Sequence, residues 1–141
     1  MRKDAREAAY RYIYSFLMTG EADDELKKDI YKEHKLNDKD VEFADTLIRT
    51  VTDNLAEFTS VLSELSVGFT EERVNPLDKD AIFIAMAEIK FFKDIDNPVS
   101  INEAVGLCKK YSGETSVNFV NGILASYLRL SLIHISEPTR P

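Results

Sequence analysis

The sequence is poor in cysteine, proline and glycine, and it contains no tryptophan. Its single cysteine, Cys108, cannot form an internal disulfide, which fits a reducing compartment. Only 4 prolines and 5 glycines occur in 141 residues, so helices are favoured over a turn-rich all-β fold. No run of about 18 apolar residues is present, and the first residues lack the apolar block of a secretion signal. We therefore expect a soluble cytoplasmic protein that has no association with a membrane.

Histidine is also scarce, which argues against metal binding and against catalysis by histidine. His34 and His134 are separated by most of the chain, and no Cys and His cluster has the spacing of metal ligands. The same scarcity gives no support to catalysis by histidine. We expect no catalytic residues, no bound metal and no cofactor.

The charge balance limits where a nucleic acid could bind. The net charge is −7, and nonspecific affinity for nucleic acid comes mainly from neutralised phosphates. The composition, 44% hydrophobic and 30% charged, suits one domain of ordinary size with a sizeable core. Any RNA-binding site on this domain must therefore be local.

Residues 98–124 form the most informative stretch, which we interpret as two helices joined tightly. Ser100 followed three residues later by Glu103 matches a capping box, so the first helix should begin at Ser100. Gly113 should end it. Its buried stripe is predicted to contain Ile101, Ala104, Val105, Cys108 and Tyr111.

The second helix of this pair carries an aromatic residue that its own pattern does not explain. Thr115 or Ser116 is the predicted cap, and the buried stripe should contain Val117, Val120, Leu124, Tyr127 and Leu128. Phe119 lies roughly 130° from the centre of that stripe, at about 100° per residue, so it should project toward solvent or a partner. The pattern equally allows Phe119 to cover a neighbouring helix.

A helix is also predicted near the N-terminus, over residues 4–18. Beside its apolar face, Arg2, Arg6, Tyr10 and Tyr14 stand four residues apart, with Lys3 and Arg11 flanking them. Basic side chains contact phosphates and aromatic rings stack on unpaired bases, so this stripe suits single-stranded RNA. A mixed, solvated helix face is the commoner outcome for such a pattern.

The middle of the chain is predicted to be helical as well. A short helix is expected over residues 22–34, and a long apolar pattern over residues 37–65 should break near Asn54 and pack within a bundle. Asn75 and Pro76 predict the start of another helix. Residues 66–75 are the expected hinge between two helical halves, residues 1–66 and 75–129.

Three segments resemble the NusB family. INEAVGLCKKYSGETSVNFVNGIL, residues 101–124, is similar to the family's INEAhELAK-like run, short loop and FVNGhL motif. RKDAREAAYRYIY, residues 2–14, resembles the family's N-terminal pattern, with Arg11 where Gln is usual. LDKDAIFIAMAEIKFF, residues 77–92, fits only in part, because Phe83 and Ala87 stand where Arg and Tyr are frequent.

This resemblance implies an all-α, NusB-like bundle of two packed helical subdomains. It also implies a transcription antitermination factor that binds boxA RNA of ribosomal RNA transcripts with the ribosomal protein NusE, as part of the transcription elongation complex. Homodimers occur in parts of the family, and the sequence leaves this open. The expected RNA-binding residues are Arg2, Lys3, Arg6, Arg11, Ser116, Asn118 and Phe119. The residues expected to face NusE are Tyr14 and Asp78, although Asp78 also fits an ordinary solvated carboxylate.

Two other functions are compatible with parts of the pattern. The N-terminal domain of a ribosomal RNA cytosine methyltransferase resembles NusB, but that enzyme needs a glycine-rich cofactor loop and a nucleophilic cysteine in a further domain, and neither is present here. A truncated reading frame would explain such a loss. A helical interaction module that does not bind RNA would show no salt-dependent association with it.

The end of the chain, residues 130–141, changes character abruptly. LSLIHISEPTRP resembles the translation of a transposase adapter used in sequencing libraries. We interpret this tail as non-native and exclude it from function, so the predicted domain covers residues 1–129. A genuine hydrophobic extension is the alternative.

Overall fold

A computed structural model of the protein describes residues 2–66 and 74–136, with side chains as far as Ser131. These residues form seven α-helices and one short 3-10 helix, and no strand occurs among them. The predicted all-α class is confirmed. Most of the expected hinge, residues 67–73, lies outside the described residues. The elements are α1 (Arg2–Thr19), α2 (Asp24–Glu33), α3 (Asp38–Asp53), α4 (Leu55–Leu65), α5 (Pro76–Phe91), α6 (Asn97–Tyr111), η2 (Glu114–Ser116) and α7 (Val117–Ser136).

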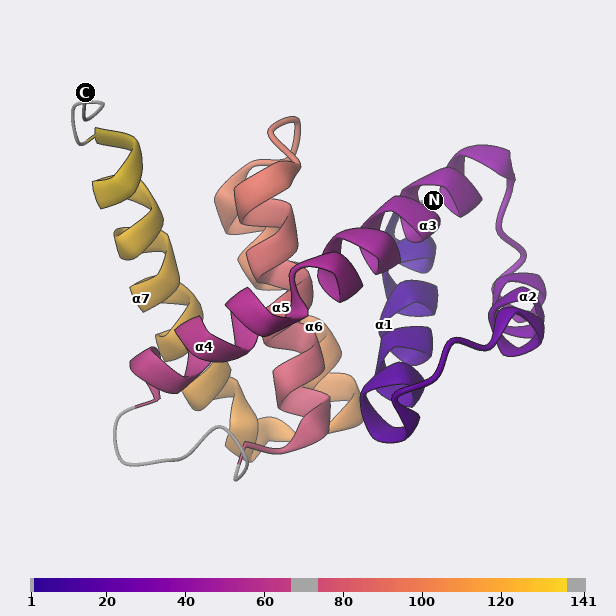
Figure 1. Ribbon diagram of the computed structural model, residues 1–141, viewed down its shortest axis with the longest axis horizontal. Helices are drawn as coiled ribbons and strands as arrows, with labels where there is room; N and C mark the ends of the chain where they lie inside the picture. The colour runs from indigo at the N-terminus through magenta and orange to yellow at the C-terminus, as the bar shows by residue number, and fades with distance from the viewer. Residues whose placement is uncertain (1, 67–73, 137–141) are drawn as a thin grey trace.

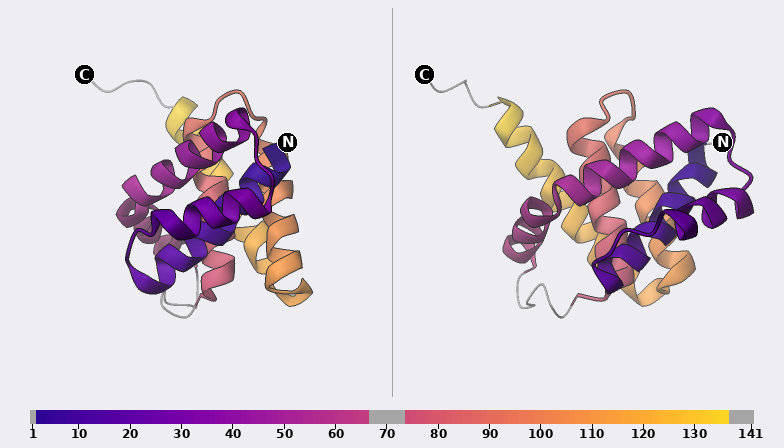
Figure 2. Two further views of the ribbon diagram at one scale, coloured as in Figure 1. Left: turned by 90° about the vertical axis from the view of Figure 1, so that its right-hand side faces the viewer. Right: turned by 45° about the vertical axis from the view of Figure 1, so that its right-hand side comes forward.

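Helix α5 is the centre of the bundle. All residues from Asp80 to Ile89 are buried, as expected for a helix that is covered on every side. Figure 1 shows α5 between α7 on one side and α1 on the other, with α3 crossing in front. Helix α6 also packs against α5, while the far end of α7 extends away from the bundle (Figure 2).

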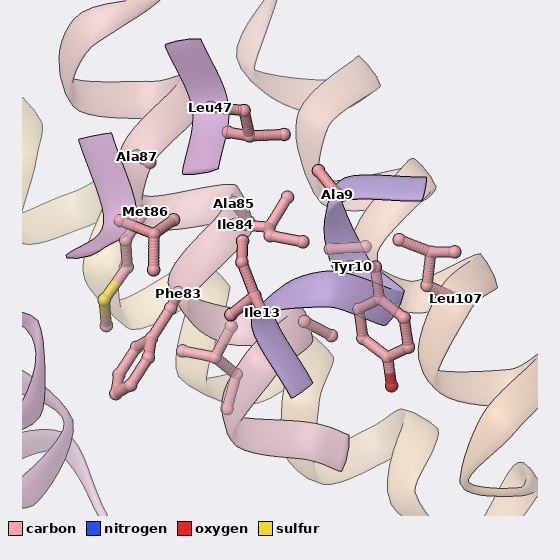
Figure 3. Close-up of a cluster of buried hydrophobic side chains, with 14 of the residues drawn as sticks. Ala9, Tyr10, Ile13, Leu47, Phe83, Ile84, Ala85, Met86, Ala87 and Leu107 are labelled. Atoms are coloured by element: carbon pink, nitrogen blue, oxygen red, sulfur yellow. The ribbon is translucent and has the colours of Figure 1, made fainter. Parts of the chain in front are cut away.

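The core draws side chains from both halves of the chain. Figure 3 shows Ile13 of α1, Leu47 of α3, Phe83 and Ile84 of α5 and Leu107 of α6 in one buried cluster. Because α5 contacts α1 and α3 as well as α6 and α7, this core is continuous across the two halves.

Several helix boundaries follow local signals. The side chain of Asn75 accepts a hydrogen bond from the backbone N–H of Leu77, 2.9 Å away, and Pro76 occupies the first helical position. The predicted break near Asn54 is confirmed, since α3 and α4 meet there. Gly113 follows α6 with φ +127°, a backbone conformation that favours glycine.

The predicted capping box at Ser100 is wrong. Helix α6 begins at Asn97, one turn earlier, and Ser100 lies inside the first turn, where it is 1% exposed. Its backbone N–H donates to the carbonyl of Asp96, and its hydroxyl donates to Glu88 on α5. The Ser100 hydroxyl therefore bonds to a neighbouring helix rather than to its own backbone.

Candidate nucleic-acid interface

The predicted basic and aromatic stripe on α1 is only partly exposed. Arg2 is exposed and Tyr14 is half-buried, but Arg6 is 3% exposed and Tyr10 is 1% exposed. The expectation of one outward-facing stripe is therefore wrong at Arg6 and Tyr10. The reason is that α5 and α6 cover this side of α1.

Arg6 takes part in a buried ionic network. Its Nε lies 2.6 Å from Glu88 Oε2 and its Nη2 lies 3.0 Å from Glu88 Oε1, so both carboxylate oxygens accept from one guanidinium. Ser100 Oγ donates to Glu88 Oε1 at 2.7 Å, and Glu103 Oε1 is 3.5 Å from Arg6 Nη1. The network joins α1, α5 and α6, and it occupies the guanidinium that was expected to contact phosphate.

Arg2 is held at the surface by an aromatic ring and a carboxylate. Its guanidinium carbon lies 4.8 Å from the centroid of the Phe43 ring, and its Nη2 lies 3.4 Å from Asp94 Oδ2. The Phe43 ring in turn packs edge-on against Phe92. Because half of the Arg2 side chain remains accessible, its positive charge is both positioned and available to a phosphate.

Lys3 lies next to a cavity between α1 and α6. The cavity has a volume of about 300 Å³, and Lys3, Asn102, Gly106 and Lys110 are among the residues that line it. Lys3 is exposed and forms no ion pair within the described part of the chain. It is therefore the least neutralised cation of the predicted set.

Glu7 joins the middle of α1 to the end of α6. Its carboxylate accepts hydrogen bonds from Lys110 Nζ at 2.6 Å and from the hydroxyl of Tyr111. Burial acts to raise the pKa of Glu7, but these hydrogen bonds and the charge of Lys110 outweigh burial and hold the pKa below its ordinary value. Burial and the bond to Glu7 raise the pKa of Tyr111 to about 12, so its hydroxyl remains a donor at neutral pH.

Arg11 faces the end of α2. It forms an ion pair with Glu33, and its Nη1 lies 3.1 Å from His34 Nε2. Its side chain is about one-third exposed. Arg11 thus extends the basic edge of α1, but its charge is largely balanced by Glu33.

The residues expected at the start of α7 lie just beyond the end of α6. Ser116 is half-buried in η2, with its Oγ 3.1 Å from Ser112 Oγ, and Asn118 is exposed. Because Glu7 ties Tyr111 to α1, this turn lies beside α1.

The prediction that Phe119 projects outward is wrong. Phe119 is half-buried and packs against the hydrophobic core. The buried face of α7 contains Ile123, which the predicted stripe omitted. Val117 and Leu128 of that stripe are only half-buried, and the buried residues Val120, Ile123, Leu124 and Tyr127 centre roughly 90° from Phe119, which places the ring at the edge of the face.

The two residues expected to face NusE have different environments. Tyr14 is half-buried on α1, one turn beyond Tyr10, whose hydroxyl donates to the carbonyl of Leu77 at 2.8 Å. Tyr14 therefore lies near the start of α5. Asp78 is 5% exposed and accepts from the Cys108 thiol at 3.4 Å, so the solvated alternative for Asp78 is wrong. Burial and Asp78 raise the pKa of Cys108 to about 12.

No local pattern in the sequence places Asn102, Gly106 and Lys110 at this interface. Lys110 lies in the last turn of α6, where a cation is favourable even without a ligand. Its spacing to Asn102, eight residues, does show that both lie on one side of α6. Only the packing of α6 on α1 shows which side that is.

Other binding chemistry finds little support in the described residues. No group of three or more His, Cys, Asp or Glu side chains there is arranged to hold a metal ion. None of the described helices is long and apolar enough to cross a membrane.

Comparisons with known proteins point to one family. The sequence pattern of the NusB family matches residues 3–129. The chain is 30% identical over 128 residues to the transcription antitermination protein NusB of Finegoldia magna, covering 91% of this chain and 93% of that protein.

Solved structures are similar as well. The solution structure of NusB from Aquifex aeolicus is 30% identical, with a TM-score of 0.80 over 99% of this chain and 95% of that one. A crystal structure of the antitermination factors NusB and NusE in complex with dsRNA is 28% identical, with a TM-score of 0.82 over 92% of this chain and 96% of that one.

Proposed function

The chain belongs to the NusB family, and on that basis we propose that it binds boxA RNA of nascent ribosomal RNA transcripts together with NusE and so suppresses termination in the cytoplasm. Its relatives are named as transcription antitermination proteins rather than enzymes, so the methyltransferase alternative is not retained. No bond is made or broken in this activity. The protein acts as an adaptor between RNA, NusE and the elongation complex.

The observation that best supports RNA binding is the exposed basic end of α1 beside the cavity that separates α1 from α6. Arg2 and Lys3 are accessible there, and Lys110 is 60% exposed across the cavity from Lys3. These cations would contact phosphates, while Ser116 and Asn118 supply polar groups for sugar or base. A local cluster of this kind allows an acidic protein to bind RNA.

The buried and half-buried members of the predicted set take other roles. Arg6 would act as a positioning residue, because it holds α6 against α1 and does not reach solvent. Arg11 would contribute a weaker phosphate contact, since Glu33 balances its charge. Phe119 would offer only the exposed edge of its ring.

For NusE we propose the surface around Tyr14 and the first turn of α5. Tyr14 provides the accessible aromatic contact, and exposed Met18 lies one turn beyond it on α1. Asp78 would support this surface from within by fixing α5 against Cys108. With NusE on this surface and RNA on the neighbouring one, the protein would bind both partners at the same time.

A charge-removal experiment tests RNA binding. We expect Arg2→Gln with Lys3→Gln to weaken binding of a labelled boxA-like strand and to lower the slope of log K against log salt by about one unit or more. Fluorescence anisotropy over a salt series measures both. Lys28→Gln with Lys32→Gln, which removes two exposed lysines of α2, is the matched control. An unchanged slope in the first variant would exclude this end of α1 as the RNA site.

A second variant tests the NusE surface. We expect Tyr14→Ala to weaken NusE binding about tenfold, as for a partly buried tyrosine at an interface. Calorimetric titration with NusE measures the effect, and thermal unfolding followed by circular dichroism checks that the variant is folded. Binding of RNA alone should stay at its wild-type level. Full NusE affinity in the folded variant would rule out the assignment of Tyr14.

A further inference from the structure

We infer that the cavity between α1 and α6 is a seat for one unpaired nucleotide, with Gly106 as its floor, Asn102 at one end and Lys3 and Lys110 beside it. This inference rests on the proposed RNA-binding function. It adds a defined base-binding position beside the phosphate contacts proposed for Arg2, Lys3 and Lys110. The cavity of about 300 Å³ is at the small end of the range for ligand pockets.

Gly106 has no structural role that its surroundings reveal. It lies inside α6 without a positive φ, so its backbone conformation does not require glycine. A Cβ placed there would meet no other atom within 4 Å, so packing does not require glycine either. Glycine nevertheless destabilises a helix interior relative to alanine. The missing side chain leaves the floor of the cavity flat and open.

The polar residues beside this floor suit a nucleotide. Asn102, Gly106 and Lys110 follow one another at four-residue intervals, so they form a column on one side of α6. Asn102 is exposed and forms no hydrogen bond within the described part of the chain, so its amide offers both a donor and an acceptor to a base edge. Leu107, which is 8% exposed, adds apolar surface against which a base can lie.

The cations are placed for the phosphate of the same nucleotide. Lys3 borders the cavity from α1 and Lys110 borders it from α6, where Glu7 holds its ammonium group. Glu103 is drawn toward Arg6 at 3.5 Å, which limits its repulsion of a phosphate. The cavity thus combines the glycine floor, an amide and two cations, a combination that suits single-stranded RNA, while the carboxylates of Glu7 and Glu103, which also line it, are paired with Lys110 and Arg6.

The test combines abasic RNA with substitutions in the floor. Wild-type protein is titrated with boxA-like strands that each carry one abasic nucleotide, and we expect one position to weaken binding about tenfold, within the range for one base contact. Gly106→Leu fills the seat and should weaken the intact strand by a similar factor. It should leave binding of the strand that is abasic at that position unchanged.

Stability measurements on the same variants distinguish a role of Gly106 in RNA binding from a role in folding. Gly106→Leu should raise the unfolding midpoint in urea, because leucine is a better helix former than glycine, so weaker RNA binding could not come from misfolding. Gly122→Leu, at an exposed α7 glycine with no atom within 4 Å of its Cβ position, is the matched control. Asn102→Ala should weaken only the intact strand.

Two results distinguish failure of the nucleotide seat from failure of the proposed function. If wild type binds RNA with a normal salt dependence but Gly106→Leu weakens the intact and the abasic strands equally or not at all, the nucleotide seat is excluded while the proposed function stands. If wild type shows no salt-dependent binding to any strand, the proposed function fails, and the seat fails with it.

Discussion

Glu88→Ala is expected to lower the free energy of unfolding by about 3–5 kcal/mol, the effect of removing one partner from a buried ion pair. Glu88 is 0% exposed, and the Arg6 side chain that it neutralises is 4% exposed. Removing the carboxylate would leave a guanidinium in the core with only Glu103, 3.5 Å away, to balance it. Urea unfolding followed by circular dichroism measures the change.

A double substitution separates the ionic network from simple loss of packing. Arg6→Met with Glu88→Met replaces both charges by apolar side chains, which is often neutral or stabilising for a buried pair. We therefore expect the double variant to recover most of the stability that Glu88→Ala loses. A Glu88→Ala loss below about 1 kcal/mol would show that the network contributes little. Arg6→Ala should be as damaging as Glu88→Ala, so reduced RNA binding in that variant would follow from unfolding.

The second large effect is expected at Asp80, whose replacement should stabilise the protein. Asp80 is 0% exposed, and neither of its carboxylate oxygens has a hydrogen-bond partner. Burial raises its pKa well above the ordinary value of 3.8, which favours the neutral acid in the folded state. We expect Asp80→Ala to raise the free energy of unfolding at pH 8 by about 1–3 kcal/mol, because an unsatisfied buried polar group is removed.

The buried Asp80 should also make the stability of the protein depend on pH. Between the ordinary pKa and the raised one, folded Asp80 keeps its proton and unfolded Asp80 has lost it. The unfolded state then binds fewer protons, so stability falls as pH rises through that window and levels off above it. Asp80→Asn keeps the shape but cannot ionise, so it should abolish this decline. Urea unfolding from pH 4 to 8 tests it, and an equal decline in wild type and Asp80→Asn would contradict the assignment.

The interface shows a limit of helical periodicity. The four-residue spacing of Arg2, Arg6, Tyr10 and Tyr14 does place them on one side of α1. However, a period describes a face and not what covers it. Here α5 and α6 cover the middle of that face, while its N-terminal end remains exposed. The bridge from Arg6 to Glu88 spans 82 residues of sequence, and no local pattern could identify that partner.

Ser100 and Phe119 illustrate the same limit at short range. Ser100 and Glu103 have the spacing of a capping box, but the nearby Glu88 and Arg6 offer stronger, charged partners. For Phe119, the predicted face omitted the buried Ile123 and counted Val117 and Leu128, which are only half-buried, and together these turned an edge position into an outward one. Both errors concern contacts between helices rather than the existence of the helices.

The sequence by itself determined the all-α class, the break at Asn54, the start of α5 at Pro76 and the family signature in residues 101–124. These features depend on interactions within one or two helical turns, which a linear pattern contains. Only the tertiary structure decided that Arg6 is buried, that Glu7 holds Lys110, and that a cavity lies over Gly106. Those features depend on how α1, α5 and α6 pack, and residues up to 104 positions apart meet there.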